Sequence, residues 1–378
     1  MLESLIDTLG LPTFVLILVG MSLLIVVILL MSYFKVLISI TNFTFPNAKL
    51  RAKGNPFIKK EVLKSLVDSS NITEVLSKIQ EENYELPKEE TENLSSIEKK
   101  LEENVIESIK KTYMSVPTNF KPFVNIWLMK YDLKMVKRAM KAKFRGVDKE
   151  KLDERLSPVK IIDEEKLEEM KSARNMQELI AILKETQFEK PLKGKEKVDD
   201  FFDVDVELDK FLFQKIRKAV NQVEGEERST VRYFFGNYTD VLNLKIIFRG
   251  LREEVEEEKL KESLLPSGRE LEDWKLENMV ESTNLDEALI ELEGTSYDDL
   301  REAKSTTSYF NLEKKLDEKL LTVVSEIYSQ EILTVGPLLK FLIAKEMELR
   351  NLKILIRGVK ESMNPEKMSD LMVMEGPG

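Results

Sequence analysis

One short pattern occurs three times along the chain and constrains the fold more than any other feature of the sequence. The pattern is Asp or Asn, then Leu-Lys-x-x-x-Arg, then Gly or Ala, and it stands at residues 132–139, 243–250 and 351–358. The copies begin 111 and 108 residues apart. Three copies at nearly equal spacing indicate that one structural unit was triplicated. Triplication predicts either a pseudo-threefold arrangement or a curved row of modules.

A second pattern precedes each copy of the first and is centred on an Asn with a Glu three residues later. The Asn residues are Asn71, Asn175 and Asn284. An Asn side chain at this place can accept a hydrogen bond from the first helical turn, and the Glu favours the positive end of the helix. Apolar residues at helical spacing flank each Asn, so one amphipathic helix ends and another begins there. We therefore expect the three Asn residues to cap helices.

The two patterns interleave three times, which predicts three homologous helical modules after residue 40. Gly and Pro are scarce, with 14 and 12 residues, while Leu, Ile, Lys and Glu recur at helical spacing. This composition favours an all-α fold. The predicted modules span residues 41–150, 151–262 and 263–378. Turn-forming residues predict linkers near 157–158 and 265–268, and an exposed loop at 185–200.

Residues 8–34 contain no Asp, Glu, Lys or Arg and consist mainly of Leu, Ile and Val. As a helix this segment would be roughly 40 Å long, against a hydrocarbon core of ~30 Å, so residues 1–40 are predicted to anchor the chain in the lipid bilayer. A signal peptide is the competing interpretation, but the apolar run is too long and acids rather than Lys or Arg precede it. Six basic residues follow the run before the next acid, which predicts that the rest of the chain lies in the cytoplasm, on the inner side of a cell membrane.

The composition excludes several kinds of site. The chain has no Cys and no His, which removes disulfides, Cys-containing zinc sites, thiol nucleophiles and imidazole bases. It also lacks a glycine-rich phosphate loop, so we expect no catalytic residues, metal or cofactor. The formal net charge of −10 disfavours nucleic acid as a partner.

The Lys and the Arg of each triplicated pattern stand four residues apart and therefore lie side by side on a helix. Like charges at this spacing repel, so their recurrence indicates a compensating acid, either on a partner or within the chain; plain solvation is the other interpretation. The small residue after each Arg is expected to permit close packing or to end the helix. The candidate partner-interface residues are Lys134, Arg138, Lys245, Arg249, Lys353 and Arg357.

These patterns resemble the C subunit of archaeal and bacterial A/V-type ATP synthases, which is related to the d subunit of eukaryotic vacuolar ATPases. The resemblance rests on residues 45–53, on the three copies of the triplicated pattern and on residues 356–366, and it covers about residues 41–372. The first copy departs from the other two, since it has Asp132 and Ala139 where they have Asn and Gly. The apolar N-terminal segment lies outside the part that the family shares.

The resemblance implies a funnel of three helical modules around a pseudo-threefold axis, seated on the membrane ring of proteolipid (c/K) subunits. It implies that the funnel receives the central shaft subunits D and F and carries torque without binding ATP or conducting ions. The implied role is that of a non-catalytic central-stalk subunit of a rotary H⁺- or Na⁺-transporting ATP synthase. The absence of a carboxylate from residues 8–34 agrees, because an ion carrier needs one at membrane depth.

Two other functions are compatible with the residues. The chain could be a membrane-tethered helical scaffold for a different complex, which would not purify with a proteolipid ring. A carboxylate-based hydrolase ranks last, because the 68 acidic residues form no recognisable site in the sequence.

Overall fold

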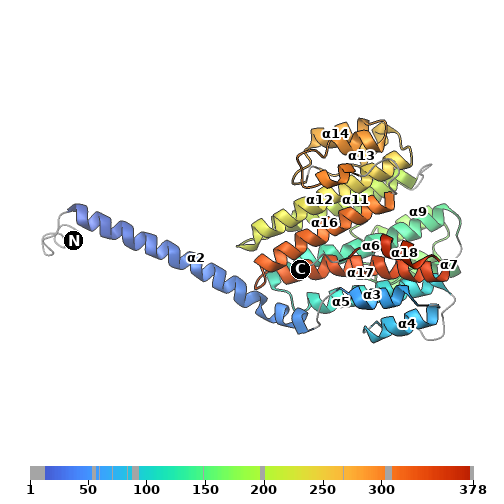
Figure 1. Cartoon of the computed structure of the whole chain (residues 1–378), viewed down its shortest axis with the longest axis horizontal. Coiled ribbons are helices and arrows are strands. Elements are labelled where there is room, and N and C mark those ends of the chain that lie inside the picture. The colour runs from blue at the N-terminus through green and yellow to red at the C-terminus, as the bar shows by residue number, and fades with distance from the viewer. Residues whose placement is uncertain are drawn as a thin grey trace.

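The chain forms a body of packed helices from which one long helix projects (Figure 1). The computed structural model describes residues 13–52, 57–58, 60–69, 71–82, 84–86, 93–147, 149–195, 201–266, 268–302 and 309–374. Within these ranges all regular secondary structure is helical, which confirms the all-α prediction.

Three hairpins of long helices build the body, and the second helix of each hairpin carries one copy of the triplicated pattern. We call α6, α12 and α17 the motif helices, and α5, α11 and α16 the leading helices. Their bounds are α5 Leu94–Tyr113, α6 Lys121–Phe144, α11 Phe201–Asn221, α12 Glu227–Arg252, α16 Tyr309–Gln330 and α17 Gly336–Lys360.

Shorter helices connect and cover these hairpins. They are α3 Lys60–Val67, α4 Ile72–Glu81, α7 Lys149–Asp153, α8 Glu164–Ser172, α9 Met176–Leu183, α10 Glu189–Leu192, α13 Glu257–Ser263, α14 Asp273–Glu281, α15 Leu285–Ile290 and α18 Pro365–Leu371, with the 3-10 turns η1 Thr118–Phe120 and η2 Asp298–Glu302.

The long helices contact one another in a closed cycle. Each leading helix packs on the motif helix of its own hairpin, and the motif helices α6, α12 and α17 pack on the leading helices α11, α16 and α5 of the following repeat. The last repeat therefore returns to the first. This cyclic order agrees with triplication, whereas superposition of the three modules and their boundaries stay predictions.

The short helices extend the same cyclic order. The pair α3 and α4 packs on α17, α9 packs on α6, and the pair α14 and α15 packs on α12. In every repeat at least one short helix thus covers the motif helix of the preceding repeat, so units that are contiguous in sequence interlock in space.

The three Asn residues cap helices as predicted. Asn71, Asn175 and Asn284 precede α4, α9 and α15, and their side chains accept hydrogen bonds from the backbone N–H groups three residues later at 2.9, 2.9 and 3.0 Å. In the second and third repeats the Glu at that position also accepts from the backbone N–H before the cap. These boxes satisfy N–H groups that the helix itself leaves without an acceptor.

The small residue after each Arg permits close packing, as expected. A methyl group on Gly250 would come within 2.3 Å of Leu260 on α13, and one on Gly358 would come equally close to Met368 on α18. Ala139, at the same place in the first repeat, is fully buried.

The expectation of an exposed loop at residues 185–200 holds for only part of its described range. Residues 189–192 form α10, and Phe188, Pro191 and Leu192 are buried. Apolar side chains within the charged stretch anchor it to the body; residues 196–200 lie outside the described ranges. The predicted linkers do connect helices, but Ser157 and Leu265 in them are also buried.

The projecting helix α2 (Thr13–Ala52) is continuous and extends well past the predicted anchor boundary at residue 40. Its large apolar side chains are exposed from Ile17 to Ile38, whereas Phe43, Asn47 and Leu50 are buried against the body. The helix is long and apolar enough to cross a membrane by length and composition. Residues 1–12 of the predicted anchor lie outside the described ranges.

Gly336 offers a test of this packing. Gly336 is the first residue of α17. A Cβ there would lie 2.7 Å from the carbonyl oxygen of Glu331 and 2.9 Å from that of Ile327. Because backbone atoms cannot move aside as a side-chain tip can, we expect Gly336→Ala to lower the free energy of unfolding by about 1–3 kcal/mol. Gly20→Ala is the matched control, since nothing lies within 4 Å of a Cβ at that helical glycine. Thermal unfolding in detergent should separate the two variants; equal melting would contradict the close approach.

Candidate interaction surface

The three motif helices begin at one end of the body and carry their basic residues towards the other. The end where they begin is formed by the hairpin turns at residues 114–120, 222–226 and 331–335, and we call it the turn end. Helix α2 leaves from this end (Figure 1). The Lys and Arg of the triplicated pattern follow about 20–33 Å further along each motif helix.

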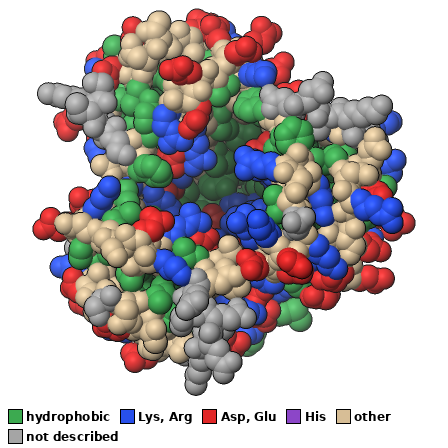
Figure 2. Space-filling view, turned by 90° about the vertical axis from the view of Figure 1, so that its right-hand side faces the viewer, with side chains coloured by type: hydrophobic (Ala, Val, Ile, Leu, Met, Phe, Trp, Pro, Cys, Tyr) green, Lys and Arg blue, Asp and Glu red, His purple; other side chains and the backbone are tan. Residues whose placement is uncertain are grey.

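The face opposite α2 is hollowed at its centre. Figure 2 shows Lys and Arg side chains gathered around the wall of this hollow and apolar side chains deeper inside it. We call it the hollow face. A concave surface lined with one sign of charge concentrates the electrostatic potential and favours a partner of the opposite sign.

The second and third copies of the pattern make the same contacts with the next leading helix. On α12, Arg249 forms two hydrogen bonds with Glu313 of α16, at 2.5 and 2.7 Å, and Lys245 pairs with Asp317. On α17, Arg357 likewise grips Glu98 of α5 with two hydrogen bonds, one of 2.8 Å. Two parallel bonds between a guanidinium and a carboxylate fix the relative position of the two helices as well as their attraction.

The first copy breaks this rule. Lys134 and Arg138 on α6 do not pair with α11 but with Glu102 on α5, at 2.6 and 2.9 Å. Two acids of α11, Asp205 and Asp209, pair instead with Lys137, at 3.0 and 2.7 Å. The other two repeats have Phe248 and Ile356 at the place of Lys137, so only the first repeat carries a cation there. That extra cation leaves Lys134 and Arg138 available for Glu102.

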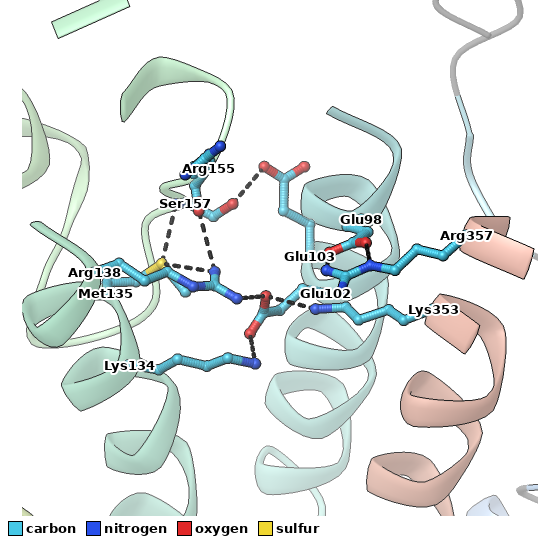
Figure 3. A network of polar contacts seen from close by, with 10 residues as sticks. All are labelled: Glu98, Glu102, Glu103, Lys134, Met135, Arg138, Arg155, Ser157, Lys353 and Arg357. Carbon is cyan, nitrogen blue, oxygen red and sulfur yellow. Dashed lines mark hydrogen bonds and ion pairs between the residues drawn. The ribbon is translucent and has the colours of Figure 1, made fainter. Parts of the chain in front are cut away.

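Glu102 therefore lies between three cations. Figure 3 shows Lys134 and Arg138 approaching it from α6 and Lys353 from α17. The Lys353 ammonium is 3.3 Å from the same carboxylate, and the Glu102 side chain is only 1% exposed. Burial acts to raise the pKa of Glu102, but the charges of Lys134, Arg138 and Lys353 together lower it to about 2. Burial, with the neighbouring Lys134 and Arg138, lowers the pKa of Lys353 despite its acidic partner.

The structure thus places all six candidate residues beside acids of the same chain, which is one of the interpretations that their spacing allowed. Lys245 and Lys353 are largely buried, whereas the side chains of Lys134, Arg249 and Arg357 are 42%, 57% and 59% exposed. Three of the cations could therefore reach a partner without leaving their internal acids. That a partner binds there stays a prediction.

Sequence reasoning assigned no role to the first residue of the pattern, and the structure gives it one. Asn243 exchanges two hydrogen bonds with the backbone of Leu265, and Asn351 does the same with Val373, in both cases 22 residues downstream. Both side chains are buried. Each Asn therefore fixes the segment that follows its motif helix.

The first repeat has Asp132 at this position, and a carboxylate cannot donate. Asp132 instead accepts from the backbone N–H groups of residues 160–162, at 3.1, 3.0 and 2.9 Å. Asp240 holds the equivalent turn of the second repeat. Recurrence of Asp or Asn ahead of a buried Leu was the only sequence signal for this role.

A second cluster that sequence reasoning missed lies where the three motif helices meet. Trp127, Tyr238 and Glu346 each stand five residues before their copy of the pattern. Lys130 joins them: its ammonium donates to Tyr238 at 2.7 Å and to Glu346 at 2.6 Å, and lies 3.9 Å from the centre of the Trp127 ring. Burial opposes the charge of Lys130, but Glu346 and Tyr238 more than offset it and raise its pKa. This cluster ties the three repeats together at their common centre.

Over the described ranges, no group of three or more acidic side chains is arranged to hold a metal ion. The chemistry that the residues described above offer is charge pairing and packing.

Comparison with known proteins identifies the family. Residues 46–371 match the model of the ATP synthase (C/AC39) subunit family. The chain therefore belongs to the family of ATP synthase C/AC39 subunits. It is 27% identical over 352 residues to the C subunit of the A-type ATP synthase of Methanocaldococcus jannaschii, which covers 90% of this chain and 88% of the relative. The protein of the same name from Methanothermobacter thermautotrophicus is 26% identical over 86% of this chain and 86% of its own length. The one from Pyrococcus abyssi is 25% identical over 88% of this chain and 90% of its own length.

Glu102 offers a test of the charge network. Replacement by Gln would leave three cations around a neutral amide, so we expect Glu102→Gln to lower the free energy of unfolding by about 3–5 kcal/mol at neutral pH. The pKa of Glu102 is lowered from 4.5 to about 2, so its stabilising effect is complete above its unfolded-state pKa and is lost as the pH falls towards 2. Chemical unfolding between pH 7 and pH 2.5 should therefore show the two proteins converging in acid.

The matched control is Glu107→Gln on the same helix, where the carboxylate is half-exposed and 3.7 Å from Lys111. Exposed pairs of this kind contribute about 1 kcal/mol or less. If Glu102→Gln were no more destabilising than Glu107→Gln, the three-cation arrangement would be wrong.

Proposed function

We propose that this chain is a non-catalytic central-stalk subunit of the rotor of an A-type ATP synthase. In this role it couples the membrane ring of proteolipid subunits to the central shaft subunits D and F while an ion gradient drives ATP synthesis. The observation that carries the proposal is the polarity of the molecule: an apolar helix leaves one end, and a basic hollow opens at the other. An adaptor between a membrane ring and a shaft needs these two different ends.

The membrane end of the proposed adaptor is α2 with the turn end. The helix exposes large apolar side chains from Ile17 to Ile38, and a run of this size is stable in hydrocarbon rather than in water. The turn end carries further exposed apolar side chains at Met114 and Leu333. The basic residues that begin at Lys35 favour a position of the body on the cytoplasmic side of the cell membrane.

The shaft end of the proposed adaptor is the hollow face. Because the basic pairs lie far from the turn end, they suit the shaft rather than the membrane ring. A basic hollow would guide an acidic shaft tip into place and hold it in one orientation. The net positive charge around Glu102, with three cations for one carboxylate, is what an acidic partner would complement.

Torque transmission requires that neighbouring helices do not slide. The closed cycle of six helices buries apolar side chains throughout, and dense packing of this kind is stiff. The paired bonds of Arg249 with Glu313 and of Arg357 with Glu98 add a fixed register at two of the three junctions between repeats.

Copurification tests the membrane end. The full chain, tagged at its C-terminus and extracted in mild detergent, should carry the proteolipid ring and the shaft subunits with it. Leu24→Glu combined with Ile28→Glu places two charges at bilayer depth, each costing about 3 kcal/mol, and should shift the chain out of the membrane fraction. Ile290→Glu, at an exposed apolar residue of the body, is the matched control and should leave the distribution unchanged. Recovery of some other complex without a ring would favour the scaffold function instead.

Lys134 tests the shaft end. Glu102 keeps Arg138 and Lys353 when Lys134 is lost, so Lys134→Gln should change the free energy of unfolding by less than about 1 kcal/mol. It should nevertheless weaken binding of subunits D and F several-fold at low salt, with the difference vanishing at high salt. Lys64→Gln, at an exposed residue of α3, controls for net charge. Equal affinities of the two variants at low salt would argue against a basic docking wall.

A further inference from the structure

The root of α2 contacts all three repeats at the turn end. Ser39 donates a hydrogen bond to Glu227 at the start of α12. The Phe43 ring meets Phe120, just before α6, edge-on with centroids 5.1 Å apart. Asn47 donates to the backbone carbonyl of Thr334, before α17, at 2.9 Å. These three residues stand four apart on one face of α2, so that face lies against the turn end beside the starts of all three motif helices.

A second set of contacts holds the end of the same helix. Arg51 donates to the backbone carbonyl of Ile332 at 2.7 Å, and Lys49 donates to the Ser115 hydroxyl at 2.9 Å. Residues 39–52 are therefore gripped between the first and third hairpin turns. The grip fixes the direction of α2 as well as its position.

No flexible segment separates this grip from the apolar part of the helix. Helix α2 is continuous, and Lys35 stands four residues, or about 6 Å, before Ser39. The apolar part must consequently follow every rotation of the body as a rigid rod (Figure 1).

The apolar part is exposed on every side. From Ile17 to Ile38 the exposed residues do not form a single stripe, as they would if one face of the helix were reserved for a protein neighbour. An environment that is apolar all around the helix is hydrocarbon.

We propose that α2 stands in the central opening of the proteolipid ring, surrounded by lipid chains enclosed there, and turns with the ring as an axial spindle. This inference rests on the proposed function, since it requires the body to rotate with the ring. A rigid helix outside the ring would sweep a circle and strike the stationary membrane subunit in every revolution. A helix on the axis sweeps no path.

Lipid quenching of a single introduced cysteine tests the proposal. The chain has no native Cys, so Val27→Cys provides one labelling position near the middle of the apolar part. A fluorophore there should be quenched by spin-labelled lipid when the isolated subunit is in vesicles. In the assembled synthase the enclosed lipid does not exchange, so quenching should fall at least fivefold. Met114→Cys is the control for a labelling position outside the lipid, because this side chain is exposed at the turn end. Its thiol should react with water-soluble reagents before assembly.

Cross-linking provides the second arm. The thiol introduced by Val27→Cys should cross-link to a cysteine on the inner face of the ring at least tenfold more than to one on its outer face. Unchanged quenching after assembly, or a cross-link to the outer face or to the stationary subunit, would overturn the axial position. In either case a complex that still purifies with ring and shaft would leave the proposed function standing, whereas loss of that copurification would remove the proposed function itself.

Discussion

The body depends on the junction between its last and first repeats. The chain itself connects the first repeat to the second and the second to the third, but only non-covalent contacts join α17 back to α5. Glu98 and Glu102 on α5 meet Arg357 and Lys353 of α17, and Glu102 also holds Lys134 and Arg138 of α6. A single buried carboxylate thus connects the closing junction to the first hairpin. Without this carboxylate its three cations would repel one another. The carboxylate is therefore required for α17 to pack on α5 and close the cycle of helices.

The contacts that close the cycle of helices differ between the centre of the body and its hollow face. At the centre, Trp127, Lys130, Tyr238 and Glu346 join the three motif helices through one buried cation and the aromatic rings beside it. Towards the hollow face, the contacts become paired charges that are half-exposed on their basic side. The interior is therefore fixed by groups hidden from solvent, while the rim keeps cations that another molecule can reach.

The sequence was sufficient for the parts of the fold that local residues determine. The cap at Asn284 depends on Glu287 three residues away, and the close approach at Gly250 depends on the absence of a side chain. The partners of the basic pairs could not be predicted, because Arg357 finds Glu98 across 259 residues. The diversion of Lys134 to Glu102 depends on Lys137, a position that varies among the repeats and therefore gave no signal. Residues 40–52 continue α2 because Phe43 and Asn47 pack on hairpin turns that are distant in the sequence, which no local pattern reveals.

The contacts that hold residues 39–52 of α2 also determine when this helix can become fixed during folding. Residues 39–52 leave the ribosome well before their partners, because Asn47 finds its acceptor at Thr334, 287 residues later, and Arg51 finds its own at Ile332. The apolar part of α2 is thus synthesised long before the turns that hold its base. The direction of α2 is therefore set only after all three hairpins have formed.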